Sequence, residues 1–360
     1  MKQICSKKLK DYCSQVLHCN GVEKNEADIC ADVLVKADLR NIPSHGVARL
    51  SMYVEAIEKD VTNLDGVLNI LKETPNTLAV DGDGKMGAAV SYDVMNRVIE
   101  KAEKHGIGIG CVRNSNHYGI AGYYAMMAAE KDMIGFSMTN SSAFGMPTFG
   151  TKVKFGTNPI AFAAPANKEK DFVLDMSTTV ITVGKVEVYN REEKKLPNGW
   201  AVDNNGQTAN NPGMILKNLI NNLGGGILPL GGEGETFGGH KGYGLAMMVD
   251  ILTGVLAGSE FSDKIQDARC TASRVSHFFM AIKIENFRDI NQFKADMDEL
   301  LQGLKNTPPS PGNDRVYYAG LKESEAEDYN LVNGIELLDM VYEDICQLGK
   351  KFNLPPLETM

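Results

Sequence analysis

The stretch NIPSHGVARL places a histidine and an arginine four residues apart. Pro43 disfavours a helix over the residues before it, and Ser44 is a favourable N-cap for a helix that starts after it. We therefore expect a helix over 45–58 that carries His45 and Arg49 on one face, because residues i and i+4 are neighbours. Histidine exchanges a proton near neutral pH, and arginine binds a carboxylate through paired hydrogen bonds. The stretch is thus a candidate site for a substrate that has a carboxylate for the arginine and exchanges a proton with the histidine.

A run rich in glycine, from Gly224 to Gly244, contains ten glycines in 21 residues. Glycine lets a backbone approach a ligand closely, and the run leads into the apolar stretch 243–256, which we expect as a buried helix. Free N–H groups at a helix start favour an anion, and His240 and Lys241 add side-chain donors. The run is therefore either a binding site for an anion such as a nucleotide pyrophosphate or a surface lid.

Two shorter stretches each allow a functional and a structural interpretation. Residues 171–179 read as an apolar strand that ends in an acid and hydroxyl groups, at Asp175, Ser177, Thr178 and Thr179. These groups either line a ribose or cap the next helix. Asn158, directly before a proline, forms either a tight turn or a contact to the substrate or nicotinamide.

Two nucleotide-binding motifs are nearly present. Residues 82–87 read G-x-G-x-x-G, but Arg113 and Asn114 stand where a Rossmann site carries its ribose-binding acid. Residues 232–244 have the glycine spacing of a P-loop, at Gly234 and Gly239. However, His240 stands where a P-loop carries its lysine, and Gly242 stands where it carries a serine or threonine. We reject the Rossmann interpretation. A P-loop-like phosphoryl-transfer enzyme and a non-catalytic nucleotide-binding protein are the alternatives from other classes.

The composition is that of an ordinary globular chain. Its 360 residues are 43% apolar and 23% charged, and a net charge of -9 makes nucleic acid an unsuitable partner. The seven cysteines include no C-x-x-C pair and join no metal pattern, so we expect reduced thiols, no metal and a cytoplasmic location. The N-terminus has no signal-peptide pattern, and the longest apolar stretch is too short to span a membrane.

Hydrophobic periodicity predicts an α/β or α+β fold. Helices dominate the first 60 residues and the C-terminal end, and we expect residues 1–75 and 300–360 to form one helical lobe that contributes to a substrate site. Residues 76–299 form the dinucleotide-binding and substrate region. Expected strands are 77–82, 107–113, 134–140, 159–165, 171–177 and 277–287; expected helices are 89–106, 119–132, 212–222, 290–306 and 333–352. The stretch 190–242 otherwise reads as loops. His18, His105 and His277 have no polar constellation nearby in the sequence, so we expect each of them to be a surface or core residue without polar surroundings.

Nine motifs occur in a fixed order, and together they resemble the type-2 malate/L-lactate dehydrogenase family over roughly residues 40–315. They are PSHGVAR, RNSNHYGIAGYYA, TNSSAFGMPTFG, FGTNPIAFAAP, LDMSTT, NGWAVD, ILPLGG, GGHKGYGLAMMVDILTGVLAG and PSPGNDR. The family includes ureidoglycolate, sulfolactate and diketogulonate dehydrogenases and a cyclic-imine reductase. The resemblance implies a non-Rossmann nicotinamide-binding fold with a largely antiparallel central sheet, and a homodimer whose active site is shared or closely apposed between subunits.

The resemblance also implies roles for particular residues. His45 would be the proton donor and acceptor, Arg49 would bind the substrate carboxylate, and His117 is the rival acid/base. Ser44 and Asn158 are expected at the substrate. The residues expected along the dinucleotide are Phe172, Val173, Leu174, Asp175, Met176, Ser177, Thr178, His240, Lys241, Gly312, Asn313 and Asp314, although many members carry glutamate where Asn313 stands.

The chemistry agrees with these roles. Oxidation of a 2-hydroxy acid moves a hydride to the nicotinamide and a proton to a base, and a cation must hold the carboxylate. We expect L-malate and oxaloacetate as the substrate pair; lactate, sulfolactate, ureidoglycolate or a cyclic imine are the alternatives on the same fold. NAD is the expected cofactor, and NADP is possible.

Overall fold

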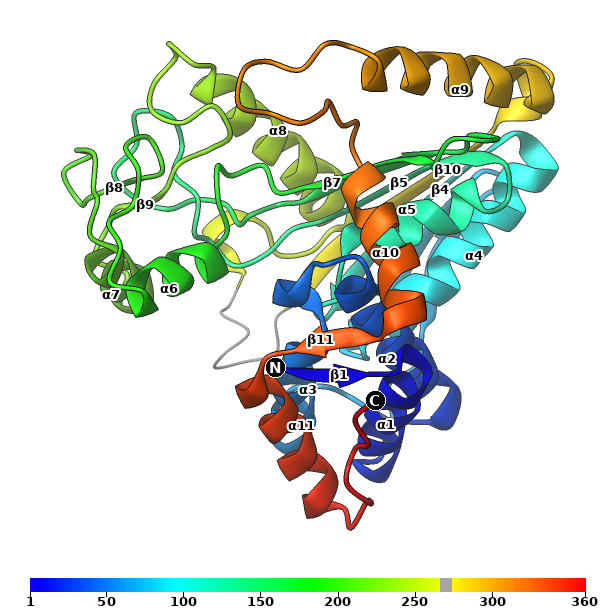
Figure 1. The fold of residues 1–360 in the computed structure, drawn as a ribbon, viewed down its shortest axis with the longest axis horizontal. Helices are drawn as coiled ribbons and strands as arrows, with labels where there is room; N and C mark the ends of the chain where they lie inside the picture. Colours follow the sequence, from blue (N-terminus) through cyan, green and yellow to red (C-terminus); the bar gives the residue numbers. More distant parts are fainter. Residues whose placement is uncertain (266–273) are drawn as a thin grey trace.

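The computed structural model describes residues 1–265 and 274–360, and its centre is a sheet of seven strands (Figure 1). In spatial order the strands are β2 (Asn69–Glu73), β3 (Thr77–Asp81), β4 (Ile107–Ser115), β10 (Val275–Lys283), β5 (Met133–Thr139), β6 (Ile160–Ala164) and β7 (Phe172–Met176). Within this sheet β3 and β4 run parallel, and every other neighbouring pair is antiparallel. A Rossmann sheet is essentially parallel, so the prediction of a non-Rossmann, largely antiparallel sheet is confirmed.

Helices cover both faces of the sheet. On one face α4 (Gly87–His105) and α5 (Ala121–Ala129) bury Val98, Tyr124 and Phe279 in a common core. On the other face α8 (Gly239–Asp250) packs Val249 against Phe278. The helix α9 (Ile290–Lys305) lies at the top of Figure 1, beyond this second face.

The two ends of the chain meet in a helical lobe below the sheet in Figure 1. It contains α1 (Ser6–Cys19), α2 (Lys24–Leu39), α3 (Leu50–Glu58) and α11 (Asp339–Lys351), and α10 (Leu321–Asn333) leads into it. The short strands β1 (Lys2–Ile4) and β11 (Ile335–Leu337) pair antiparallel and tie the two ends together. Residues from both ends share one apolar core, for example Leu9, Leu34 and Ile345. The boundaries of this lobe at residues 75 and 300 stay a prediction.

A third, smaller core lies beside the sheet. It is formed by α6 (Val183–Arg191), α7 (Pro212–Asn221) and the strand pair β8 (Ala201–Val202) and β9 (Gly226–Ile227). The sequence predicted α7 but described the remainder of 190–242 as loops. The two strands are only two residues long, which is too short for an alternating pattern to be visible.

Two helix predictions need correction. The expected buried helix over 243–256 starts earlier, at Gly239, continues as a π-helical turn over Ile251–Val255, and exposes an apolar face. The expected helix over 333–352 begins instead as strand β11, because its first residues pair with β1. No helix of the described chain is both long enough and apolar enough to cross a membrane.

Candidate active site

A cavity of about 250 Å³ lies where the helical lobe, the ends of β4 and β5, and α6 converge. The lobe contributes His45, Arg49 and Met52, and the segment after β4 contributes His117. Further lining residues are Tyr118, Gly119, Thr139, Asn140, Ser141, Ser142, Phe144, Thr157, Pro159, Val183, Gly184, Glu187 and Val275. The structure therefore brings together the three residues that the sequence predicted as catalytic.

The turn that carries His45 and Arg49 differs from the predicted helix. Residues Pro43–His45 and Val47–Arg49 form two 3₁₀ turns, separated by an extended Gly46, and α3 begins only at Leu50. Ser44 is not an N-cap. Its carbonyl oxygen accepts a hydrogen bond from Arg49 Nε at 2.7 Å, and its Oγ lies 2.9 Å from His45 Nδ1. The histidine and the arginine are neighbours because the chain folds back, not because they share a helical face.

The two histidines of the cavity form a stacked pair. The ring centroids of His45 and His117 are 5.6 Å apart, with an angle of 18° between the ring planes. Behind His117, Tyr53 Oη lies 2.9 Å from Nδ1, and the Gly119 N–H donates to the same nitrogen at 3.4 Å. Burial raises the pKa of Tyr53 well above its usual value, so its hydroxyl keeps its proton. Tyr53 Oη can donate to or accept from Nδ1, but the Gly119 N–H can only donate, so we assign the proton of the neutral His117 ring to Nε2.

Burial and a nearby cation keep both imidazoles neutral. Burial lowers the pKa of His45 to about 4, and the Arg49 guanidinium acts in the same direction. Burial also lowers the pKa of His117 well below its usual value, with further contributions from His45, Arg49 and His277. A carboxylate bound beside Arg49 would offset the positive charge of the guanidinium and raise both pKa values.

His277 contradicts the prediction that it has no polar surroundings. It is fully buried in β10, with Nδ1 2.9 Å from Thr139 Oγ1 and Nε2 2.9 Å from Ser115 Oγ. Its ring stacks on Tyr118, with centroids 4.5 Å apart and planes 3° apart. The histidine thus links β4 and β5 directly beneath the cavity. The local sequence around His277 does not indicate these partners, because they depend on the register of three strands distant in sequence.

The predicted dinucleotide stretch 172–178 runs along the edge strand β7; it lines one cavity, and its end bonds to a residue that lines the other. Val173, Leu174 and Asp175 line a second cavity of about 320 Å³, together with Arg40 and Tyr317. The Asp175 carboxylate accepts a hydrogen bond from the Gly122 N–H at 2.7 Å, and the residue is exposed toward this cavity.

At the other end of this stretch, the Thr178 N–H donates to the Thr157 carbonyl oxygen at 2.8 Å, and Thr157 lines the first cavity. Phe172 packs against a separate apolar cluster. Met176 and Ser177 lie between the two ends of the stretch and line neither cavity.

Other predicted binding residues lie outside both cavities. His240 and Lys241 are exposed in the first turn of α8, and Gly312, Asn313 and Asp314 are exposed in a loop. Asn158 is fully buried, and its Nδ2 donates to the Ala246 carbonyl oxygen of α8 at 3.0 Å. The described residues contain no cluster of side chains suited to a metal ion.

Comparisons with known proteins agree with this geometry. The family model described as malate/L-lactate dehydrogenase matches residues 4–346. The malate dehydrogenase of Pyrococcus abyssi is 44% identical over 350 residues, which cover 97% of this chain and 95% of that protein. The malate/(S)-sulfolactate dehydrogenase of Methanothermus fervidus is 37% identical over 94% of this chain and 95% of its own length. The crystal structure of malate dehydrogenase from Entamoeba histolytica superposes with a TM-score of 0.94 at 34% identity, covering 98% of this chain and 99% of that one.

Proposed function

Because this chain belongs to the malate/L-lactate dehydrogenase family, we propose that it transfers a hydride between a nicotinamide cofactor and the pair L-malate and oxaloacetate. The observation that carries the proposal is the cavity in which Arg49 lies beside the stacked pair His45 and His117. This combination supplies a cation for a carboxylate and a group that exchanges a proton, which are the two protein functions that the reaction needs.

We propose Arg49 as the residue that binds the substrate carboxylate. Its Nε is already bonded to the Ser44 carbonyl oxygen, which holds the guanidinium in place. The two terminal nitrogens have no partner among the described residues, so they can bind both carboxylate oxygens. The position of the carboxylate then determines where the 2-oxo group lies relative to the two imidazoles.

We propose that the histidine pair transfers the proton, and the hydrogen bonds favour His117. Transfer of the Nε2 proton to the 2-oxo oxygen requires the imidazolium form of His117; the ring that remains is neutral with its proton on Nδ1, where Tyr53 Oη, 2.9 Å away, can accept a hydrogen bond from it. The motif-based assignment to His45 stays a prediction, since Ser44 Oγ can either donate to or accept from His45 Nδ1 and does not determine its tautomer.

The residues along β7 are suited to a dinucleotide. Part of the stretch 172–178 lines the second cavity and its end bonds to Thr157 of the first, and Asp175 presents a carboxylate in the second cavity that could accept hydrogen bonds from ribose hydroxyls. We propose that this stretch holds the cofactor, and that His240, Lys241 and the loop 312–314 contact it from the surface. The bound cofactor supplies or accepts the hydride. NAD is the proposed cofactor, and NADP is tested beside it.

The experiment is a substrate screen that follows the absorbance of reduced nicotinamide. Oxaloacetate, pyruvate, sulfopyruvate and a cyclic imine are each tested with NADH and with NADPH, and oxaloacetate should be reduced fastest. Hydrolysis of magnesium-ATP without oxidation of NADH would favour a phosphoryl-transfer enzyme. Binding of NADH without turnover of any oxo acid or imine would favour a non-catalytic nucleotide-binding protein.

We also propose that the chain forms a homodimer in the cytoplasm. The α8 helix and its π-helical continuation expose Met247, Met248, Ile251, Val255 and Leu256, an apolar face that a second copy would cover. All six cysteines among the described residues are free thiols, which agrees with a reducing compartment.

A further inference from the structure

The turn between His45 and Arg49 rests on a buried carboxylate. Asp38, in the last turn of α2, is only 6% exposed, and its Oδ2 accepts a hydrogen bond from the Val47 N–H at 2.7 Å. Val47 starts the second 3₁₀ turn, midway between the two candidate catalytic residues. This one hydrogen bond therefore joins helix α2 to the centre of the turn.

Gly46 allows the carboxylate to come this close. A Cβ atom at this position would lie 1.9 Å from Asp38 Oδ1, which no side chain could tolerate without a shift of the turn. The φ of Gly46 is -83°, an angle open to any residue, so the glycine is required by the contact with the carboxylate and not by its own backbone conformation. Asp38 thus contacts two consecutive residues of the turn.

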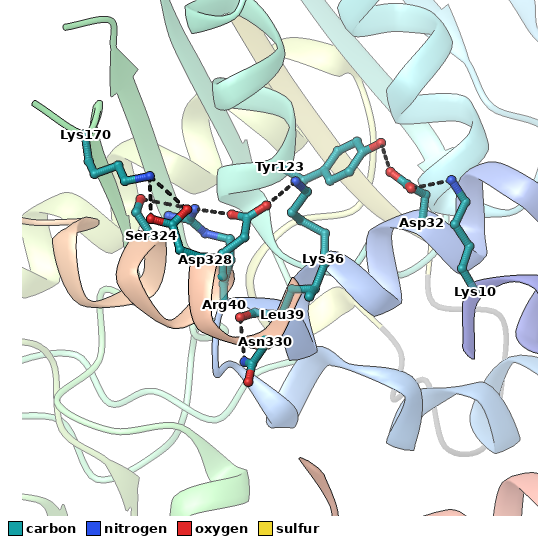
Figure 2. A network of polar contacts seen from close by, with 11 residues as sticks. Lys10, Asp32, Lys36, Leu39, Arg40, Tyr123, Lys170, Ser324, Asp328 and Asn330 are labelled. Atoms are coloured by element: carbon teal, nitrogen blue, oxygen red, sulfur yellow. Dashed lines mark hydrogen bonds and ion pairs between the residues drawn. The ribbon is translucent and has the colours of Figure 1, made fainter. Parts of the chain in front are cut away.

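The carboxylate has no compensating cation among the described residues. Figure 2 shows that Arg40, two residues further on, reaches Ser324 of α10 instead, and its guanidinium also pairs with Glu327. The titratable side chain that faces Asp38 from α1 is Cys13, and burial raises the pKa of Asp38 to about 7. Burial of an unpaired carboxylate is costly, and an apolar side chain of similar size would pack at lower cost. The cost indicates a function of this carboxylate at the turn.

We propose that Asp38 is a positioning residue of the reaction: its carboxylate accepts the Val47 N–H and thereby holds His45 and Arg49 at the substrate. Asp38 does not line the cavity, so it acts through the turn and not on the substrate itself. The inference rests on the proposed dehydrogenase function, because it assigns Asp38 to the same site.

The test compares two substitutions of equal size. Asp38→Asn keeps an oxygen that can accept the Val47 N–H, whereas Asp38→Leu removes it. We expect Asp38→Leu to raise the KM for oxaloacetate about tenfold and to lower kcat about 10- to 100-fold, because a displacement of about 1 Å costs up to about 10²-fold. The Kd for NADH should stay at the parental value. Asp38→Asn should restore kcat and KM to within about threefold of the parent, since its acceptor remains.

The control is Asp32→Asn, on the same helix. Figure 2 shows the Asp32 carboxylate bonded to Lys10 and Tyr123, neither of which belongs to the turn. This variant should keep both kinetic constants even if it loses stability. If Asp38→Leu does not fold, Asp38→Ser is used in its place. A serine hydroxyl is too short to reach the Val47 N–H, so this variant should show the same changes in KM and kcat.

Parental KM and kcat in Asp38→Leu or Asp38→Ser would overturn the inference, as would an equal loss in Asp38→Asn and Asp38→Leu. An unmodified chain that reduces no oxo acid or imine of the panel would instead contradict the proposed function.

Discussion

At the scale of single residues, the stacked histidines define the first prediction. We expect His117→Ala to lower kcat about 10²- to 10⁴-fold, the usual size of a general acid–base contribution. It should also remove the neutral-pH limb of the rate profile. His45→Ala should have the smaller effect and keep the parental pH profile, because His117 retains its bonds to Tyr53 and Gly119. Steady-state rates across pH for the two variants measure this, and the opposite result would assign the proton to His45.

Arg49 gives a prediction that separates binding from chemistry. Arg49→Lys keeps the positive charge but loses the planar pair of terminal nitrogens, so we expect mainly a higher KM for the 2-oxo acid. The bond from Nε to the Ser44 carbonyl oxygen is lost as well, so a small fall in kcat should accompany it. Titration of NADH fluorescence should show unchanged cofactor binding. A parental KM would exclude Arg49 as the carboxylate ligand.

At the scale of secondary-structure elements, the start of α8 carries a prediction about the cofactor. Lys241 is exposed in the first turn of α8, where unpaired N–H groups favour an anion. If its ammonium contacts the cofactor phosphates, Lys241→Ala should weaken NADH binding by about 1.5–3 kcal/mol, the contribution of one charge-assisted hydrogen bond. Lys217→Ala, which removes an exposed lysine from α7, is the control. Equal affinities in both variants would make the glycine-rich run a surface lid.

At the scale of the whole molecule, we predict that the chain forms a dimer through the exposed apolar face of α8. Ile251 is 51% exposed at the centre of this apolar face, so Ile251→Asp should place a charge in the proposed dimer interface. Light scattering after size exclusion should give twice 39.2 kDa for the parent chain and 39.2 kDa for the variant. Ile220→Asp, at a 68% exposed position of α7, should leave the dimer intact. A parent chain that is monomeric at micromolar concentration would contradict the proposal.

Buried His277 gives a prediction about stability and pH. Burial lowers the pKa of His277 to about 3, below its unfolded value of about 6.5, so the folded state prefers the neutral ring. Its contribution to the free energy of unfolding is complete above about pH 6.5 and is lost as the pH falls toward the folded pKa. The destabilisation caused by His277→Gln should therefore be about 2–3 kcal/mol smaller at about pH 4.5 than at about pH 7.5.

Chemical denaturation at the two pH values measures this difference. Taking the difference between variant and parent separates the effect of His277 from those of Asp38 and Asp250, whose raised pKa values make the protein less stable as the pH rises. The exposed His105→Gln is the control. A destabilisation that does not change with pH would contradict the lowered pKa.

Local patterns and motif order were sufficient to predict six of the seven sheet strands, most helices, the family, and three residues that meet in one cavity, His45, Arg49 and His117. The edge strand β2 was not predicted. The predicted properties follow from side-chain periodicity, glycine and proline positions, and residue types, which are present along the chain itself. The conformation of the turn that carries His45 could not be predicted in this way. It depends on the hydrogen bond to the Asp38 carboxylate of α2, and the local residue preferences of the turn do not indicate that contact. Likewise, Tyr53 meets His117, and His277 meets Thr139, only after distant segments are packed in one register. Whether the apolar face of α8 is exposed also depends on where α8 lies on the sheet. An apolar stretch does not indicate by its sequence whether the core of its own chain or a second subunit covers it.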